Sequence, residues 1–202
     1  MLAEQMIKNL KRRNMTAFYC ASAEEAVQKV MEQIPDGSSV TWGGSMTIRD
    51  MGLTKALHES GKYEVLDRDL LTDRKDVEEL YIKTFSTDVF LSSANAISED
   101  GEIVNIDGNG NRVAAITFGP KRVVFVISLN KVCGTLEAAI TRAHTTAAPV
   151  NCARFDIVTP CHKDGRCHNC NSEQCICNYI HVLRNSPHGR HTVVLVGEDL
   201  GY

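Results

Sequence analysis

The segment RVVFVIS at residues 122–128 constrains the fold most, because it is apolar at almost every position. A strand with one face in water alternates apolar and polar side chains, whereas a strand that is covered on both faces is apolar throughout. The segment TVVLV at residues 192–196 has the same character. Strands of this kind occur mainly in parallel sheets that carry helices on both faces. The two segments therefore predict an α/β fold with a buried central sheet.

Predicted strands and helices alternate along the rest of the chain, which favours a twisted, mostly parallel sheet. The polar, glycine-rich segment at 96–121 is typical of a hairpin or an irregular loop at the sheet edge. Ser22 and Glu25 have the spacing of a capping box. We expect one three-layer domain over residues 1–202, with a cysteine-rich insertion at about 159–178. Further strands are predicted at 38–42, 63–66 and 88–93, and helices at 2–10, 23–34, 47–61, 77–85 and 136–143.

In open α/β sheets, ligands bind beyond the carboxyl ends of the strands, where the connecting loops meet. The first such loop contains Gly43, Gly44, Ser45 and Thr47. Glycines let the backbone approach a ligand, and the two hydroxyls, with main-chain amides at a helix N-terminus, can bind a phosphate or a carboxylate. The same residues also suit a tight turn and an ordinary helix cap. We take all four as candidate ligand-binding residues.

The second loop follows the strand at 88–93 and combines Asn95 with two acidic residues, Glu99 and Asp100. A carboxylate here can act as a base or a nucleophile, so Glu99 and Asp100 are candidate catalytic residues. Asn95 is a candidate ligand-binding residue. Asp-Gly pairs are also favoured in hairpin turns. The alternative is therefore a type I′ turn at Asp100 and Gly101, with Glu99 in solvent.

The third loop is DGNGNR at residues 107–112, in which two glycines lie among polar side chains. It suits an anion or a sugar, or simply a tight loop. It lacks the spacing and the strand-to-helix context of a dinucleotide fingerprint, so we expect no nucleotide cofactor. Its residues are all candidates for ligand binding: Asp107, Gly108, Asn109, Gly110, Asn111 and Arg112.

Five cysteines lie within residues 159–178 with the spacing C-x5-C-x2-C-x4-C-x-C. The short gap between Cys167 and Cys170 lets both thiolates bind one metal centre. Cys161 and Cys177, with Cys175 as the alternative, complete four ligands, which suit either zinc or an iron–sulfur cluster. Reactive thiols are the second interpretation, and disulfides the third, because a reducing cytosol disfavours them. The remaining cysteines are isolated in sequence and are predicted to be small buried residues: Cys20, Cys133 and Cys152.

Charge and hydropathy restrict the partners and the location. A net charge of −3 and a pI near 6.2 give no general electrostatic reason to expect nucleic acid or an anionic membrane as a partner. Residues 1–19 lack the apolar core of a signal peptide, and no later stretch is long enough to span a bilayer. We therefore expect a cytoplasmic protein. A homodimer is expected on general grounds, since two-fold dimers are the commonest oligomers.

Four segments resemble the LUD domain family of bacterial lactate utilization proteins: WGGSMTIRDMGL, SANAISEDGEIVNIDGNGNRVAAITFGPKRVVFVISLNKV, TPCHKDGRC and LVGEDLGY. The resemblance implies a fold similar to the NagB/RpiA/CoA-transferase group and a link to the oxidation of lactate to pyruvate. The three loops match family signatures, with Asp50 where many members have glutamate. Four of the clustered cysteines match a pattern seen in a subgroup, whereas Cys175 is extra. The family has no securely established catalytic residue, so the resemblance implies no mechanism.

No ferredoxin-type cysteine runs follow the matched segments, so the chain resembles the stand-alone LutC type more than the LutB type. We expect a protein of lactate or organic-acid utilization that binds an anionic small molecule. It would belong to a redox system with iron–sulfur partner subunits. The first alternative is an autonomous enzyme similar to CoA transferases or sugar-phosphate isomerases. The second is a non-enzymatic, metal-stabilised scaffold subunit.

Overall fold

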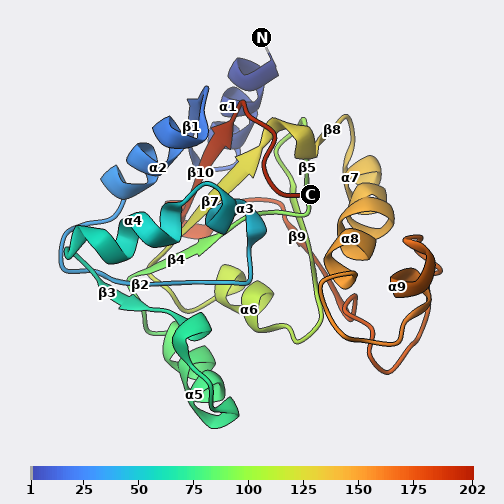
Figure 1. Cartoon of the computed structure of the whole chain (residues 1–202). Coiled ribbons are helices and arrows are strands. Elements are labelled where there is room, and N and C mark those ends of the chain that lie inside the picture. Colours follow the sequence, from blue (N-terminus) through green and yellow to red (C-terminus); the bar gives the residue numbers. More distant parts are fainter. Residues whose placement is uncertain (1) are drawn as a thin grey trace.

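The computed structural model of the protein describes residues 2–202 and has a six-stranded sheet at its centre (Figure 1). Every pair of neighbouring strands in this sheet is parallel. All strands predicted from the sequence are present in it, so the α/β fold with a mostly parallel sheet is confirmed. The strand order is β1 (Thr16–Cys20), β10 (His191–Val196), β7 (Arg122–Ser128), β4 (Val89–Ser92), β2 (Ser39–Trp42) and β3 (Glu64–Leu66).

Helices cover both faces of the six-stranded sheet. On one face, α2, α3 and α4 bury Val30, Ile48 and Leu57 against the strands. On the other face, α1 and α6 pack around Phe125 of the central strand β7. β7 is buried from Val123 onward, as its apolar sequence predicts. The helices are α1 (Leu2–Arg12), α2 (Ala23–Glu32), α3 (Met46–Asp50), α4 (Leu53–Ser60), α5 (Arg74–Thr84), α6 (Asn111–Thr117), α7 (Leu136–Arg142), α8 (Ala148–Cys152) and α9 (Pro160–Asp164), with a π-helical segment at Ala143–Ala147 and 3-10 turns at Arg68–Leu70, Leu129–Lys131 and Pro187–Gly189.

Local sequence accounts for several helix boundaries. The hydroxyl of Ser22 accepts a hydrogen bond from the main-chain N–H of Glu25 at 3.2 Å, as expected of the predicted capping box. The helix predicted at 47–61 is instead two helices, α3 and α4. Gly52 separates them because its left-handed conformation (φ +78°) cannot continue a helix. Gly61, also left-handed, ends α4 as predicted.

A second sheet of four strands was predicted only in part. β5 (Ala96–Ser98) and β6 (Ile103–Asp107) form an antiparallel hairpin within the segment predicted as a hairpin or loop. β9 (Tyr179–Leu183) pairs antiparallel with β6. One face of this sheet joins the main core through Ile97 and Ile103, and the other packs under α7 and α8 through Ala96 and Val104. The order is β8 (Val132–Cys133), β5 (Ala96–Ser98), β6 (Ile103–Asp107) and β9 (Tyr179–Leu183).

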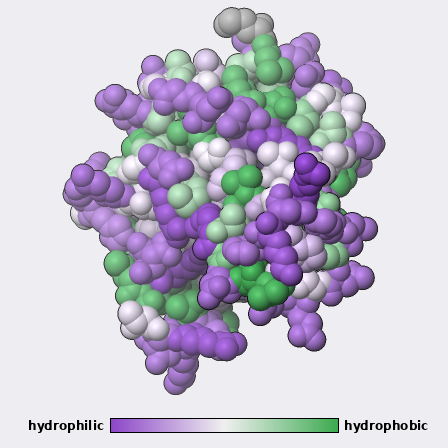
Figure 2. Space-filling model, turned by 45° about the vertical axis from the view of Figure 1, so that its right-hand side comes forward, coloured by the Kyte–Doolittle hydropathy of each residue, from purple (hydrophilic) through white to green (hydrophobic). Residues whose placement is uncertain are grey.

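The cysteine-rich segment connects α8 to β9 and contains α9 (Figure 1). It lies on the same side of the molecule as α7 and α8. That side is mainly polar, with small apolar areas set among the polar ones (Figure 2). Within residues 2–202, no helix is long and apolar enough to cross a membrane.

Candidate functional site

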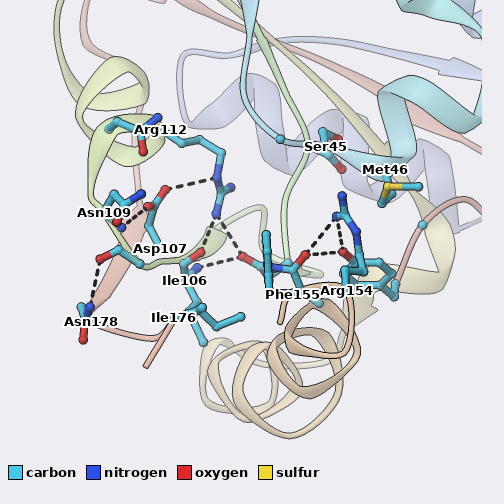
Figure 3. A pocket seen from close by; sticks show the side chains of 18 of the residues that line it. Ser45, Met46, Ile106, Asp107, Asn109, Arg112, Arg154, Phe155, Ile176 and Asn178 are labelled. Carbon is cyan, nitrogen blue, oxygen red and sulfur yellow. Dashed lines mark hydrogen bonds and ion pairs between the residues drawn. The ribbon is translucent and has the colours of Figure 1, made fainter. Parts of the chain in front are cut away.

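Three adjacent strands, β2, β4 and β7, end side by side and direct their following loops into one cavity of about 540 Å³. This is the edge at which open parallel sheets bind ligands. The loop after β6 and the last two residues of the chain close other sides of the cavity. Most of the predicted ligand-binding residues line it (Figure 3): Gly44, Ser45, Thr47, Asn95, Asp107, Gly108, Asn109, Asn111 and Arg112.

Lys131 also lines the cavity, although the sequence did not single it out. It lies in the 3-10 turn after β7, and only 2% of its surface is exposed. Its ammonium group donates to Thr47 Oγ1 at 2.8 Å, to Ser93 Oγ at 3.2 Å and to the main-chain oxygen of Ala94 at 3.3 Å. All three donors of the ammonium group are therefore used within the protein.

The hydrogen bonds of Lys131 leave the hydroxyls of Thr47 and Ser93 able to donate to a ligand. Thr47 Oγ1 and Ser93 Oγ each accept from the ammonium, and a hydroxyl that accepts one bond keeps its own hydrogen free to donate. Both residues line the same cavity. The arrangement can therefore present two O–H donors to an anion, with a buried positive charge directly behind them.

The charge of Lys131 is held in an unfavourable environment. Burial lowers the pKa of Lys131 to about 7, and the positive charges of Arg142 and Arg112 act in the same direction. The negative charge of Asp50 acts in the opposite direction but is the smallest of these effects. No carboxylate of the described residues forms an ion pair with its ammonium group. A bound anion would add a negative charge close to the ammonium group and so favour the protonated lysine.

Arg112 lines the cavity and is hydrogen-bonded to strand β6 of the second sheet. Its guanidinium donates to Asn105 Oδ1 at 2.6 Å. It also donates to the main-chain oxygen of Ile106 and lies 3.3 Å from Asp107 Oδ2 (Figure 3). The planar guanidinium is suited to such multiple fixed contacts. A Cβ atom on Gly43 would lie 2.8 Å from Arg112 Cδ, so Gly43 shapes the site although it does not line it.

The loop at 107–112 is both a tight turn and a wall of the cavity. Asp107 Oδ1 accepts from the main-chain N–H groups of Asn109 and Gly110, at 3.1 and 2.8 Å. Gly110 adopts φ +82° just before α6 and does not itself line the cavity. Ser45 likewise caps α3, since its hydroxyl accepts from the N–H of Ile48 at 3.4 Å. The loops at 43–47 and 107–112 therefore form the tight turn and the helix cap that were the alternative to ligand binding, and they also line the cavity.

Two further arginines, Arg154 and Arg68, line the cavity. Arg154 donates to Asn151 Oδ1 at 3.1 Å and to the hydroxyl of Tyr202 at 2.9 Å, and Arg68 donates to the hydroxyl of Tyr81 at 2.8 Å. The lining of the cavity includes four basic residues, Arg68, Arg112, Lys131 and Arg154, and two acidic residues, Asp107 and Glu173. This excess of positive charge favours the binding of anions.

Glu99 and Asp100 lie away from this cavity. They form the turn between β5 and β6, where both residues are exposed. The main-chain oxygen of Glu99 accepts from Asn9 Nδ2 at 2.8 Å, and that of Asp100 accepts from the guanidinium of Arg13. Neither residue lines the cavity, so their predicted catalytic role stays a prediction without geometric support.

The cysteine-rich segment encloses a second cavity, of about 170 Å³. It is lined by all five clustered cysteines and by Cys152 from the end of α8. Cys152 is buried as predicted, and the fold brings it to the clustered cysteines although it is isolated in sequence. Cys133, which was also predicted to be buried, is only half-buried. Within residues 2–202, no three His, Cys, Asp or Glu side chains are close enough together to hold a single metal ion. Burial and neighbouring thiols, Cys175 first, raise the pKa of Cys177 to about 12.

The fold and the first cavity define an α/β protein in which strand-end loops enclose a basic pocket. Comparison with family models is more specific: the LUD domain model matches residues 3–196. The chain therefore belongs to the LUD domain family, which is associated with lactate utilization. This confirms the resemblance seen in the sequence. Comparison with curated protein sequences gave no match.

Comparison with solved structures agrees with the family assignment. A DUF162 family protein from Deinococcus radiodurans is 14% identical, with a TM-score of 0.59 over 97% of this chain and 96% of its own. Ribose 5-phosphate isomerase A from Methanocaldococcus jannaschii is 13% identical, with a TM-score of 0.37 over 56% and 55% of the two chains. The eIF2B-beta2-delta2 complex from C. thermophilum is 15% identical, with a TM-score of 0.43 over 86% and 55%. The first likeness shows a shared fold, and the other two are too weak to bear on function.

Proposed function

We propose that the protein binds a small organic-acid anion in the 540 Å³ cavity and serves lactate or related organic-acid utilization. The observation that carries this proposal is the buried ammonium of Lys131, which lies 2.8 Å from Thr47 Oγ1 and 3.2 Å from Ser93 Oγ. A buried charge without an ionic partner is costly, and an anion is the partner that the cavity can admit.

The hydroxyls of Thr47 and Ser93 would donate to one carboxylate of the ligand, while Lys131 supplies the charge behind them. Hydrogen bonds to a charged acceptor are about twice as strong as neutral ones, which gives the carboxylate the orienting role. Arg154 and Arg68 also line the cavity and suit a second anionic group of a larger ligand. The family's association with lactate utilization makes 2-hydroxy and 2-oxo acids the first ligands to test.

A second candidate is an enzyme similar to sugar-phosphate isomerases or CoA transferases. The size of the cavity favours it, because a three-carbon acid would occupy only a small part of 540 Å³. Lys131 in its neutral form would be the available base, since Glu99 and Asp100 lie outside the cavity. Turnover of a phosphorylated sugar or a coenzyme A thioester by the purified chain alone would establish this candidate.

The test is calorimetric titration of the purified protein with lactate, pyruvate, longer 2-hydroxy acids and phosphorylated sugars. We expect saturable binding of at least one of these anions, and loss of that binding in Lys131→Met. Lys11→Met is the matched control, because Lys11 is an exposed lysine of α1 that does not line the cavity. Binding that is equal in both variants, or absent from the wild type for all the anions, would refute the proposal.

A further inference from the structure

The cavity in the cysteine-rich segment is lined by six thiols that come from three parts of the chain. Cys152 ends α8, Cys161 lies in α9, and the others come from the loop before β9: Cys167, Cys170, Cys175 and Cys177. Thiols are weak hydrogen-bonding groups, so hydrogen bonding alone does not account for the gathering of six around one space. Thiolates, by contrast, are strong ligands for soft metals.

We propose that this cavity holds an iron–sulfur cluster ligated by Cys161, Cys167, Cys170 and Cys177. Cys167 and Cys170 have the two-residue gap that lets both thiolates bind one metal centre, and all four cysteines line the cavity. Cys152 and Cys175 are the two further thiols of the cavity, and Cys175 is the alternative to Cys177 as the fourth ligand. Cys152 Sγ lies 3.0 Å from Thr159 Oγ1, and Cys175 Sγ accepts from the main-chain N–H of Cys177 at 3.3 Å.

The spread of the thiols favours a cluster over a single zinc ion. Tetrahedral zinc binds sulfur at about 2.3 Å, which brings its four sulfurs within about 3.8 Å of one another. Within residues 2–202, no three His, Cys, Asp or Glu side chains form a group that could hold one metal ion. A cluster gives each thiolate its own iron atom and therefore accepts ligands that stand further apart. The cavity of about 170 Å³ also has room for more than one ion.

The surroundings of the cavity suit such a cluster. Pro149, Ile176 and Ile180 also line it, so apolar residues lie beside the thiols. Thr159 Oγ1 lies 3.3 Å from Cys161 Sγ, so its hydroxyl can donate to a ligating sulfur. Hydrogen bonds and solvent exclusion are the two features by which proteins adjust the potential of a cluster.

The proposed cluster would lie next to the basic cavity. Cys175 and Ile176 line both cavities, so one short segment separates them. This segment packs closely on the loop at 107–112: a Cβ on Gly108 would lie 3.3 Å from Ile176 Cα, and Asn178 Nδ2 donates to the oxygen of Gly108 at 3.0 Å (Figure 3). Loss of the cluster is therefore expected to loosen one wall of the basic cavity.

The test is the iron, zinc and acid-labile sulfide content of the full chain purified without oxygen, together with its visible absorption and its electron paramagnetic resonance after reduction. We expect iron and sulfide in equal amounts, about two to four of each per chain, and a sulfide-to-iron charge-transfer band. The variant Cys167→Ser/Cys170→Ser should lose both. The control Cys133→Ser should keep them, because Cys133 is half-buried and lines neither cavity.

Zinc without sulfide would overturn the proposal, as would a protein that takes up no iron even when it is reconstituted with iron and sulfide under a reductant. If the double variant does not fold, the content of the wild type still decides the question, and Cys161→Ser supplies a second variant. The proposal does not depend on anion binding. Titrating the metal-loaded and the metal-free protein with the same acids tests the cluster and the anion site separately, because iron content and anion affinity are measured independently.

Discussion

The ammonium nitrogen of Lys131 lies 2.8 Å from Thr47 Oγ1, and this contact joins the 3-10 turn after β7 to α3, the helix that follows β2. The two residues are 84 positions apart in the sequence. Between them lies β4, whose following loop supplies Ser93 to the same ammonium. One buried charge therefore ties together the ends of three adjacent parallel strands.

Replacing Lys131 by methionine should weaken anion binding at least about tenfold, which corresponds to about 1.4 kcal/mol. The substitution keeps an unbranched side chain of similar length but removes the charge and the three donated hydrogen bonds. Calorimetric titration with the best-binding acid measures the effect. An affinity within twofold of the wild type would show that Lys131 is only a structural group.

The pH dependence of stability should change in the same variant. The unfolded chain holds the Lys131 proton up to about pH 10, whereas the folded protein loses it above about pH 7. The unfolded state therefore binds more protons in this window, so the stability of the free protein should rise with pH by up to about 1.4 kcal/mol per unit.

Anion affinity should move in the opposite direction, because the ligand favours the charged lysine. We expect binding to weaken as pH rises through about 7. Denaturant unfolding at several pH values, with and without the acid, tests both trends. Identical pH slopes in the wild type and in Lys131→Met would contradict this assignment.

The fold was largely predictable because its central strands carry an unmistakable pattern. β7 and β10 are apolar on both faces, and the strands that flank β7 are buried as well. β1 was missed because it is a short edge strand that exposes Thr16 and Tyr19. β9 was missed for a similar reason, since Leu183 is its only buried residue. Edge strands lack the two-sided burial on which the prediction depended.

Only those residues of the candidate site that directly follow a predicted strand could be predicted from the sequence. The loops at 43–47 and 107–112 were found because ligands gather at such ends. Lys131 was missed, although it comes three residues after β7, because a lysine in a loop is ordinarily exposed. Its burial depends on Thr47 and Ser93, which are distant in sequence. Cys152 was missed likewise, since only the folded chain brings α8 to the cysteine loop.

Gly43→Ala should destabilise the protein by about 1–3 kcal/mol and weaken anion binding. The added Cβ would lie 2.8 Å from Arg112 Cδ, and the head of Arg112 is held by Asn105 and Asp107, so the stem has little freedom to move. Gly134→Ala is the control, because no atom lies within 4 Å of the position of its Cβ. Denaturant unfolding of both variants should separate them. Equal stabilities would show that Arg112 can shift at no cost.

Glu99→Gln and Asp100→Asn should leave anion binding unchanged within about twofold, since both residues lie in the exposed turn between β5 and β6. Ser93→Ala is the contrasting variant, because its hydroxyl contacts Lys131 and lines the cavity. The same titrations apply, together with any turnover found for the wild type. Loss of binding or turnover in the Glu99 or Asp100 variant, with folding intact, would restore these residues as catalytic candidates.

Arg112→Met should lower the free energy of unfolding by about 2–4 kcal/mol and abolish measurable anion binding. The change leaves Asn105 Oδ1, which is fully buried, without the donor at 2.6 Å, and it removes the ion pair with Asp107. Arg74→Met is the matched control, because the Arg74 side chain is 93% exposed and its pairing with Glu78 is expected to contribute at most about 1 kcal/mol. Denaturant unfolding gives the stabilities. If Arg112→Met were as stable as Arg74→Met yet failed to bind, Arg112 would act on the ligand directly rather than through the loop that it holds in place.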